Sequence, residues 1–391
     1  MKIGLFTDTY YPEINGVANS CMILHKELTR RGHEVHVFAP KSRLEGGGTE
    51  DPTVHLLPSK PFLLLRDRNA AIITRKTIQS VRDLHLDVVH TNSEFAMGMF
   101  GIHSAHRNST ILVHTCHTIW EDYVGPYVTH GFCDGIGRAV TRKMVRDYCR
   151  RVDRIIVPTQ KIRGMLDRYR VTVPNEIIPT GMELDRYAPE RHSEEQRRMI
   201  REECGVQPGE RVLLNIGRIA HEKNLEQVLR VFPELKKTNP EVRLVIVGEG
   251  PALRGLRHQA RDLGVADSVT FTGPKPWDSI DQYYAIGDVF VSCSHSETQG
   301  LTYIEAMAAG LCVCAVDDPC LNGVITGGET GILSGDSDEA LLRSLRESFS
   351  PLGREIAARA PQAARPYSSS VFAERVEAFY LRAQAEKGNH K

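Results

Sequence analysis

The sequence has no apolar run long enough to cross a membrane. A membrane-spanning helix needs about 18 or more consecutive apolar residues, and no segment of the 391 residues approaches that length. The first residues, MKIGLFTDTYYPEI, carry acidic and polar side chains where a secretory signal would be apolar. We therefore expect a cytoplasmic chain that does not span a membrane.

The sequence also lacks net charge, a cysteine framework and the marks of a nucleic-acid binder. Its 49 basic residues balance 49 acidic ones, and 41% of the residues are hydrophobic, so the composition excludes disorder. The nine cysteines are odd in number, and Cys312 and Cys314 lie in an apolar segment, which indicates reduced core thiols rather than a zinc site. Stacking aromatics between basic residues are few, so we expect no nucleic-acid partner.

What the sequence does contain is a repeated alternation of short Val- and Ile-rich runs with longer helical patterns. This alternation is typical of βαβ units and a parallel sheet. Ten candidate strands form two series, separated near residues 178–187; they are residues 2–8, 34–39, 88–91, 110–117, 154–158, 211–217, 243–248, 268–273, 288–292 and 311–317. We expect an α/β chain with Rossmann-like domains at 1–180 and 181–369, and a C-terminal helix at 370–391 that crosses back to the first domain.

A polar loop followed by a helical pattern occupies SHSETQGLTYIEAMAAG, residues 294–310. The loop contains Gly300, and the helix is expected to begin near Thr302 with unpaired backbone N–H groups that suit an anion. Glu297 and Glu305 flank the loop, and their carboxylates can accept hydrogen bonds from a sugar and a ribose. Alternatively, Thr302 and Glu305 form a capping box, in which Glu305 is only structural.

Two cations follow a buried strand in LLNIGRIAHEKN, residues 213–224. Arg218 lies at the edge of the expected sheet, and Lys223 lies in the loop before the next helix. Fixed cations can stabilise a departing diphosphate without a metal, because they are already in place when the charge develops. Alternatively, both are solvated loop cations.

Two strand ends in the first half carry further candidates. In DTYYPEINGV, residues 8–17, Gly16 opens a helix and allows close approach to a phosphate, with a plain turn as the alternative. In HTCHTIWEDY, residues 114–123, His117 ends a strand, where residues of a parallel sheet face the ligand crevice. A satisfied structural histidine is the alternative there.

The glycine turn VGEGP, residues 247–251, does not complete the G-x-G-x-x-G fingerprint. This disfavours an NAD enzyme.

Taken in order, these segments resemble the retaining glycosyltransferases with the two-domain GT-B fold, over nearly the whole chain. GRIAHEKN is similar to that family's Gly-Arg…Glu-Lys-Asn signature, and Glu297 with Glu305 is similar to its Glu-x7-Glu motif. The resemblance implies two Rossmann-like domains facing across a cleft, a nucleotide-sugar donor, no metal or other cofactor, and retention of configuration at the anomeric carbon.

The same resemblance implies a role for each candidate residue. Arg218 and Lys223 hold the diphosphate, and Glu305 binds the ribose. Glu297 lies beside the donor sugar, His117 hydrogen-bonds the donor hexose, and Gly16 contributes a backbone contact. The remaining donor-binding positions are Thr298, Gln299, Gly300, Leu301 and Thr302. The first four stand where family members often have Gly-Phe-Gly-Leu, and Thr298 and Gln299 depart from that pattern.

A narrower resemblance concerns the acceptor. HTIWEDY, residues 117–123, and SETQGLTYIEAMAAG are similar to segments of bacterial diacylglycerol glucosyltransferases, which make membrane glycolipids. This implies transfer of glucose from UDP-glucose to diacylglycerol. The candidate acceptor residues are Tyr11, Trp120, Glu121 and Asp122.

A basic row independently favours a membrane acceptor. Arginines recur at every fourth residue beside an apolar row; they are Arg138, Arg142, Arg146, Arg150 and Arg154. Four like-charged pairs cost about 1–2 kcal/mol in an isolated helix, which an anionic membrane surface would offset. The apolar Phe62, Leu63 and Leu64 beside further cations suit insertion into such a surface. We therefore expect peripheral attachment to the inner face of the cell membrane; a solvated helix face and ordinary core are the alternatives.

Two other functions remain open on the same fold. One is a soluble retaining glycosyltransferase that acts on a sugar, a polyol or a thiol precursor. The other, from a different class, is a sugar-nucleotide-binding or epimerising protein, because a fold does not fix a function. The joint presence of the cations, both glutamates and His117 favours transfer.

Overall fold

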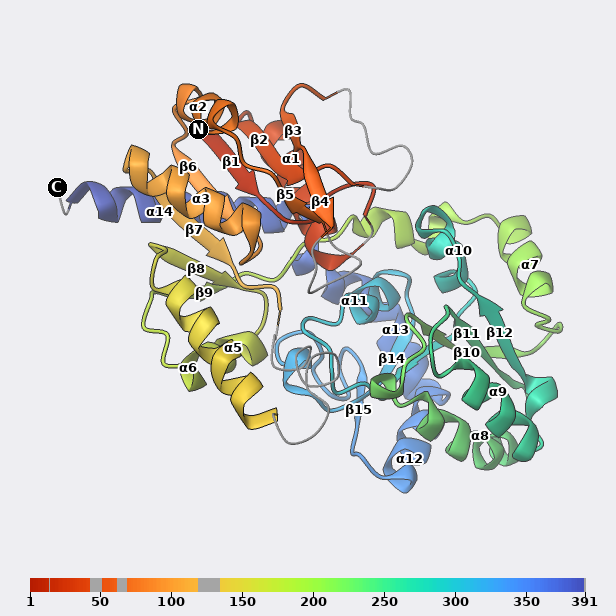
Figure 1. The fold of residues 1–391 in the computed structure, drawn as a ribbon. Coiled ribbons are helices and arrows are strands. Elements are labelled where there is room, and N and C mark those ends of the chain that lie inside the picture. Colours follow the sequence, from red (N-terminus) through yellow and green to blue (C-terminus); the bar gives the residue numbers. More distant parts are fainter. Residues whose placement is uncertain (14, 43–50, 62–68, 119–133, 390–391) are drawn as a thin grey trace. The chain divides into compact units, whose positions relative to one another are not determined.

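The computed structural model describes residues 1–13, 15–42, 51–61, 69–118 and 134–389 (Figure 1). The chain divides into two compact units. Unit 1 comprises Met1–Met182 and Ser368–Lys391, and unit 2 comprises Glu183–Tyr367. Among the described residues, no helix combines the length and the apolar character that a membrane crossing requires.

Unit 1 is built on a seven-stranded parallel sheet with the order β3-β2-β1-β6-β7-β8-β9. The strands are β1 (Lys2–Phe6), β2 (Glu34–Pro40), β3 (Val54–Leu57), β6 (Val88–Thr91), β7 (Ile111–Thr115), β8 (Arg154–Val157) and β9 (Asn175–Ile177), with a separate antiparallel pair β4 (Ser59–Pro61) and β5 (Asn69–Ala71). The helices are α1 (Gly16–Arg30), α2 (Arg75–Asp83), α3 (Ala96–Asn108), α5 (Asp134–Cys149), α6 (Gln160–Arg168) and α14 (Ser369–Asn389). Its central strands are buried apart from Lys2 at the start of β1, as expected for a parallel sheet covered on both faces.

Unit 2 repeats this plan with a six-stranded parallel sheet in the order β12-β11-β10-β13-β14-β15. The strands are β10 (Arg211–Ile216), β11 (Val242–Val247), β12 (Val269–Gly273), β13 (Val289–Ser292), β14 (Cys312–Val316) and β15 (Ile332–Ser334). The helices are α7 (Glu194–Glu203), α8 (Leu225–Thr238), α9 (Leu253–Asp262), α10 (Ile280–Tyr284), α11 (Leu301–Ala308), α12 (Asp338–Ser348) and α13 (Pro351–Ala364). Cys312 and Cys314 are buried in β14 with free thiols, as expected from the sequence.

The strand order in both units is that of a doubly wound sheet. In each unit the first three strands run to one side and the later strands run to the other, so the order reverses between β1 and β6 and between β10 and β13. Ligands of such sheets bind outside the carboxyl ends of the strands at this switch point. The prediction of two Rossmann-like domains is confirmed. A ligand is expected to bind at the four loops that follow β1, β6, β10 and β13, the strands on either side of the switch points.

All ten predicted strands are present, with ends within two residues of those expected. The sequence missed the short edge strands β3, β9 and β15 and the β4–β5 pair, because these strands are short and only partly buried and therefore contain no continuous apolar run.

The C-terminal helix α14 returns to unit 1, as expected, and packs on α1. Phe372, Val376 and Tyr380 complete one of the hydrophobic cores of this unit. The Tyr380 hydroxyl also lies 2.6 Å from Nδ1 of the buried His90 on β6. Unit 1 is therefore assembled from both ends of the chain.

The predicted arginine row is shorter than expected. Helix α5 ends at Cys149, Arg150 lies beyond that end, and Arg154 opens strand β8 and pairs with Glu386 on α14. The prediction of four like-charged helical pairs is therefore wrong, because the backbone turns after Cys149, with Arg151 N bonded to the Tyr148 oxygen and Val152 N to the Cys149 oxygen. Two such pairs remain within α5, formed by Arg138, Arg142 and Arg146.

Candidate functional site

Three of the four motifs singled out in the sequence follow strands at the two switch points, and the fourth follows the neighbouring strand. In unit 1, Gly16 opens α1 after β1, and His117 follows β7, which lies next to β6. In unit 2, the loop 217–224 follows β10 and the loop 293–300 follows β13. Strands β10 and β13 are hydrogen-bonded neighbours, so the two loops of unit 2 leave the same edge of the sheet.

The loop 217–224 is fixed by a glycine turn. Backbone bonds join Ile219 N to Glu249 O (2.8 Å) and Ala252 N to Ile219 O (3.1 Å). A Cβ at Gly248 would lie 1.9 Å from the Gly217 oxygen, and a Cβ at Gly250 would lie 2.1 Å from the Ile219 oxygen. The glycines of the VGEGP turn therefore allow close approach of two backbones, which holds the segment that carries both candidate cations.

Each candidate cation pairs with a carboxylate of unit 2. The Arg218 guanidinium donates to Glu222 within the same loop, and both side chains are about half exposed. The Lys223 ammonium lies 2.5 Å from Glu297 Oε1, with both side chains partly buried. The structure thus brings together Lys223 and Glu297 from the two motifs of unit 2.

Helix α11 begins without a side-chain cap. Its N-cap is Gly300, which has a φ of 68° and offers no capping side chain. The N–H groups of Leu301 and Thr302 in the first turn therefore lack the usual internal partner. A Cβ at Gly300 would lie 2.2 Å from the Tyr303 ring, so both the backbone conformation and the packing require glycine.

The capping-box alternative for Glu305 is wrong. Thr302 is the second residue of the helix rather than its cap, and the Glu305 carboxylate points elsewhere. Glu305 Oε1 accepts a hydrogen bond from the Tyr187 hydroxyl at 2.9 Å, and Oε2 accepts one from the Tyr284 hydroxyl at 2.6 Å. Burial raises the pKa of Glu305, and the two tyrosine hydrogen bonds act against this rise.

His117 is held by a hydrogen bond to Asn92. Its Nε2 lies 3.2 Å from Asn92 Oδ1; in this orientation of the amide, Nε2 donates the hydrogen bond and Nδ1 can accept one. Burial lowers the pKa of His117 to about 3, and nearby His114 contributes in the same direction. His117 lies two residues beyond the end of β7, which is shorter than the predicted strand. This arrangement suits accepting a hydrogen bond from a ligand hydroxyl.

The other residues expected in unit 1 give less information. Asn15 caps α1 by accepting hydrogen bonds from the N–H groups of Val17 and Ala18, and a Cβ at Gly16 would meet no atom within 4 Å. Tyr11 is 57% exposed in the loop after β1. Six predicted acceptor and membrane residues lie outside the described residues: Phe62, Leu63, Leu64, Trp120, Glu121 and Asp122.

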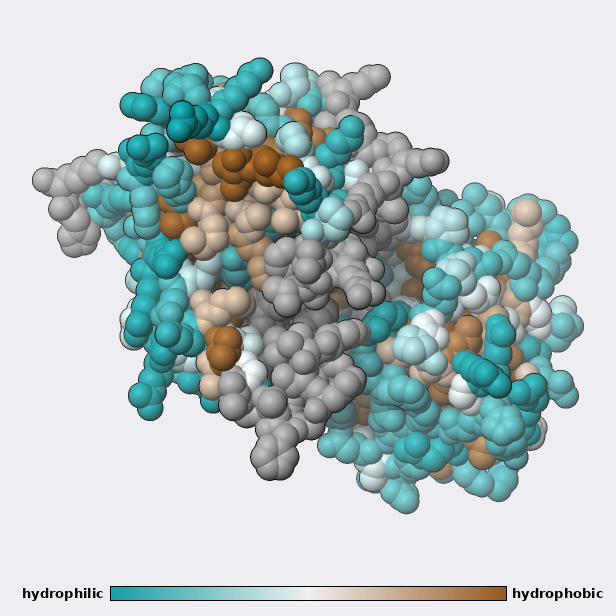
Figure 2. All heavy atoms as spheres, in the orientation of Figure 1, coloured by the Kyte–Doolittle hydropathy of each residue, from teal (hydrophilic) through white to brown (hydrophobic). Residues whose placement is uncertain are grey.

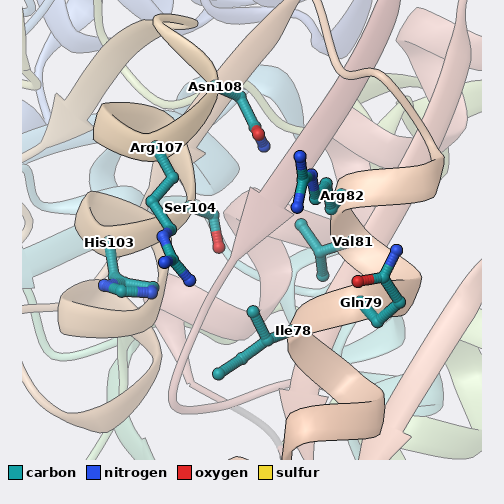
Figure 3. A pocket seen from close by; sticks show the side chains of 8 residues that line it. All are labelled: Ile78, Gln79, Val81, Arg82, His103, Ser104, Arg107 and Asn108. Atoms are coloured by element: carbon teal, nitrogen blue, oxygen red, sulfur yellow. The ribbon is translucent and has the colours of Figure 1, made fainter.

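A groove in unit 1 lies between α2 and α3 (Figure 3). Its side chains are Ile78, Gln79, Val81, Arg82, His103, Ser104, Arg107 and Asn108. The cavity volume of about 190 Å³ is below the roughly 300–1,000 Å³ of small-molecule pockets. None of the predicted site residues lines this groove, so we do not assign a substrate to it.

One group among the described residues has the composition of a metal site. The ligand atoms of Glu94, His114 and Cys116, all in unit 1, lie within 4.8 Å of one another. Burial raises the pKa of the Cys116 thiol well above its usual value, which opposes the thiolate that a metal would need. The proposed diphosphate cations of unit 2 are not part of this group.

Sequence reasoning missed four residues that contact the predicted ones. Glu222 was detectable, because it stands four residues after Arg218. Asn92 follows the carboxyl end of β6, so the rule that singled out His117 applies to it as well. Tyr187 and Tyr284 gave no signal, since nothing local shows where a buried hydroxyl points.

Two doubly wound sheets, with paired cations and acids beside an uncapped helix at the switch point of unit 2, define a GT-B type enzyme. Residues 196–351 match the family described as glycosyl transferases group 1, and residues 14–186 match glycosyltransferase family 4. The chain belongs to the group 1 glycosyltransferases.

Individual relatives and one solved structure agree with this assignment. The chain is 38% identical to alpha-monoglucosyldiacylglycerol synthase of Streptococcus pneumoniae, over 85% of this chain and 75% of the relative. It is 30% identical to the protein of the same name from Acholeplasma laidlawii, over 97% of each chain. The structure of Anabaena HepE in complex with UDP has the same fold, with a TM-score of 0.76, 18% identity, and coverage of 98% of this chain and 100% of that one.

Proposed function

We propose that the protein transfers glucose from UDP-glucose to diacylglycerol at a membrane surface, with retention of configuration, and so makes a glycolipid. Unit 2 is the nucleotide-sugar domain, and unit 1 serves the acceptor and the membrane. The observation that carries the proposal is the Lys223–Glu297 pair at the switch point of unit 2, beside the uncapped first turn of α11. That edge offers both a cation and free backbone donors to a diphosphate.

The diphosphate leaving group takes its stabilisation from fixed positive groups. Lys223 and Arg218 supply charge, and the N–H groups of Leu301 and Thr302 supply donors at the positive end of a helix. Because these groups are held in place before the reaction, they stabilise the developing charge without a metal. To bind a phosphate oxygen, Arg218 must release Glu222 and Lys223 must release Glu297. Each carboxylate stays close enough to pair with its cation again.

The glutamates and the loop between them hold the donor sugar. Glu305 binds the ribose hydroxyls, and Glu297 lies beside the hexose, with backbone contacts from residues 298–302. For His117 and Gly16 of unit 1 we keep the roles implied by the family resemblance. The neutral ring of His117, with Nδ1 as an acceptor, supports a hydrogen bond from a hexose hydroxyl.

The acceptor and the stereochemistry rest on the relatives. Both relatives reported above are named alpha-monoglucosyldiacylglycerol synthase, and one is similar over nearly its whole length. An α-linked product formed from an α-linked donor keeps the configuration of the donor carbon. This supports a retaining transfer of glucose to diacylglycerol.

Unit 1 supports a membrane-facing role. Helix α5 exposes 62% of Val140 and 40% of Met144 beside the exposed Arg138 and Arg142. Figure 2 shows further hydrophobic side chains gathered on a face of unit 1 near α2 and α3, a region in which Met99 is 42% exposed. Apolar side chains beside cations suit an anionic interface.

Membrane docking is tested by flotation of the full chain with vesicles of neutral lipid, with and without anionic lipid. We expect binding that requires the anionic lipid and falls when Val140 and Met144 are both replaced by Ser. The matched control is Met199→Ser, which removes a residue that is 58% exposed in unit 2. Equal binding to both vesicle types would contradict a role for lipid charge.

The activity itself is tested by a matrix of donors and acceptors read by mass spectrometry, with the anomeric configuration assigned by NMR. We expect UDP-glucose and diacylglycerol to give an α-linked glucolipid. Transfer to a soluble sugar, polyol or thiol precursor in preference to the lipid would favour the soluble alternative. Conversion of the donor without transfer would favour an epimerising protein.

A further inference from the structure

Two tyrosines from separate elements of unit 2 donate hydrogen bonds to the Glu305 carboxylate. Tyr187 ends the short 3-10 helix at Leu184–Tyr187, and Tyr284 ends α10. The Tyr187 hydroxyl donates to Oε1 at 2.9 Å, and the Tyr284 hydroxyl donates to Oε2 at 2.6 Å. The two rings meet edge to face with centroids 5.4 Å apart, and both are fully buried.

These two hydrogen bonds fix the orientation of the carboxylate and leave it able to accept further hydrogen bonds. An ionised carboxylate has about four acceptor positions, two on each oxygen. The tyrosines take one position on each oxygen, so one position on each oxygen remains. Because both oxygens are held, the carboxylate cannot rotate about its terminal bond without breaking one of the hydrogen bonds. The two remaining acceptor positions lie side by side in the plane of the carboxylate. They can therefore accept hydrogen bonds from two neighbouring hydroxyl groups of a ligand.

We propose that Tyr187 and Tyr284 are positioning residues that hold Glu305 as a two-point acceptor for the 2′- and 3′-hydroxyls of the donor ribose. The site thereby selects ribonucleotides over 2′-deoxyribonucleotides. The inference rests on the proposed function, in which Glu305 binds the ribose. The tyrosines themselves need no contact with the nucleotide.

A second group holds Tyr187 in place. The Arg186 guanidinium lies 4.0 Å from the centre of the Trp277 ring and 5.3 Å from that of the Tyr187 ring. Its Nη2 also donates to Asp281 Oδ1 at 2.7 Å and to the Trp277 carbonyl at 2.8 Å. The segment before Tyr187 is therefore anchored to α10, the helix that carries Tyr284. The positions of the Tyr187 and Tyr284 hydroxyls depend on this one connected set of contacts.

The charge state of the carboxylate gives an independent readout. Burial raises the pKa of Glu305, while Tyr284, Tyr187 and the charge of Arg186 act to lower it. Burial and the Glu305 charge raise the pKa of both tyrosines, so their hydroxyls stay protonated and continue to donate. Loss of one tyrosine hydroxyl should therefore raise the pKa of Glu305 further. Only the ionised carboxylate can accept from both ribose hydroxyls.

The experiment measures affinity by calorimetry for UDP and 2′-deoxy-UDP in the full chain and in Tyr284→Phe, Tyr187→Phe and Tyr303→Phe. The first two substitutions keep the buried rings and remove only the hydroxyls. Tyr303→Phe is the matched control, since its buried hydroxyl bonds Ser292 instead. We expect the unaltered chain to prefer UDP by about ten-fold, as for a hydrogen bond to a charged group. The preference should fall to about two- to three-fold in the first two variants, and the control should keep it.

The outcomes separate this inference from the proposed function. A chain that binds neither nucleotide contradicts both. A chain that prefers UDP, together with tyrosine variants that keep the full preference, overturns the positioning role and leaves the proposed function standing. Equal weakening for both nucleotides marks the hydroxyls as merely structural and also overturns it. As a second measurement, the acid limb of UDP affinity should move to higher pH in Tyr284→Phe, and an unmoved limb counts against the proposal.

Discussion

The Lys223 ammonium lies 2.5 Å from the Glu297 carboxylate, although 74 residues separate them in the sequence. The contact joins the loops after β10 and β13 across neighbouring strands. It places a cation and an acid where the switch-point rule expects a ligand. If they bind the donor as proposed, the two side chains must exchange this mutual contact for contacts with the donor.

Replacing either candidate cation should impair transfer strongly. We expect Lys223→Ala and Arg218→Ala each to reduce kcat by about 100-fold or more, because each removes a charge that stabilises the leaving diphosphate. The measurement is the rate of UDP release with the lipid acceptor present. Arg198→Ala is the matched control, since Arg198 pairs with Glu195 on the exposed face of α7. Near-normal rates in both variants would mean that the diphosphate binds elsewhere.

Replacing Glu297, the acidic partner of Lys223, should change UDP binding and turnover in opposite directions. In Glu297→Gln, Lys223 loses the carboxylate that competes with phosphate for it. We expect UDP to bind up to about five-fold more tightly, in line with a partly exposed ion pair of about 1 kcal/mol. Turnover should nevertheless fall, because the proposed contact with the sugar is lost. The measurements are calorimetry with UDP and steady-state kinetics. Weaker binding of UDP would exclude this competition.

His117 should act in its neutral form across the physiological range. Burial lowers its pKa to about 3, so the ring carries no added proton between about pH 5 and 8. We expect no limb from His117 in the pH profile of kcat/KM in that window, and ¹⁵N NMR should show a ring protonated at Nε2. A limb near pH 6.5 that disappears in His117→Gln would contradict this.

The same pKa shift has a defined sign for stability. The unfolded chain binds a proton at His117 near pH 6.5, whereas the folded chain resists it down to about pH 3. The unfolded state therefore holds more protons in this window, and the contribution of His117 to stability is lost as the pH falls from about 6.5 toward 3. The stability of His117→Gln should depend less steeply on pH there, as measured by urea unfolding.

Much of the fold could be predicted from the sequence because the central strands are rich in buried Val, Ile and Leu, as in residues 211–216 and 242–247. Edge strands such as β15 are too short for that signal. The site was predicted only in part, for a related reason. Strand ends locate Arg218, Lys223 and His117, but partners such as Tyr284 depend on how distant segments pack, which no local pattern encodes.

Gly300 should tolerate no side chain. Its φ of 68° costs an L-residue about 1–2 kcal/mol, and a Cβ there would also meet the Tyr303 ring. We expect Gly300→Ala to destabilise the chain by at least that amount in urea unfolding and to weaken UDP binding through the start of α11. Gly255→Ala in α9 is the control, because a Cβ there meets nothing within 4 Å and helical alanine is favourable. Equal stability of the two variants would contradict the requirement.

Transfer should not depend on a divalent metal. The proposed diphosphate site draws its charge from Arg218 and Lys223, so a chelator such as EDTA should leave the rate of UDP release unchanged within about two-fold. Metal content measured on the purified chain gives the complementary test. Among the described residues, Glu94, His114 and Cys116 form the group that has suitable ligands, and it lies in unit 1. If the chain held a stoichiometric metal that Cys116→Ser removed together with activity, the metal-free mechanism would be wrong. If the metal were lost and activity remained, its role would be structural, and the cations of unit 2 would keep theirs.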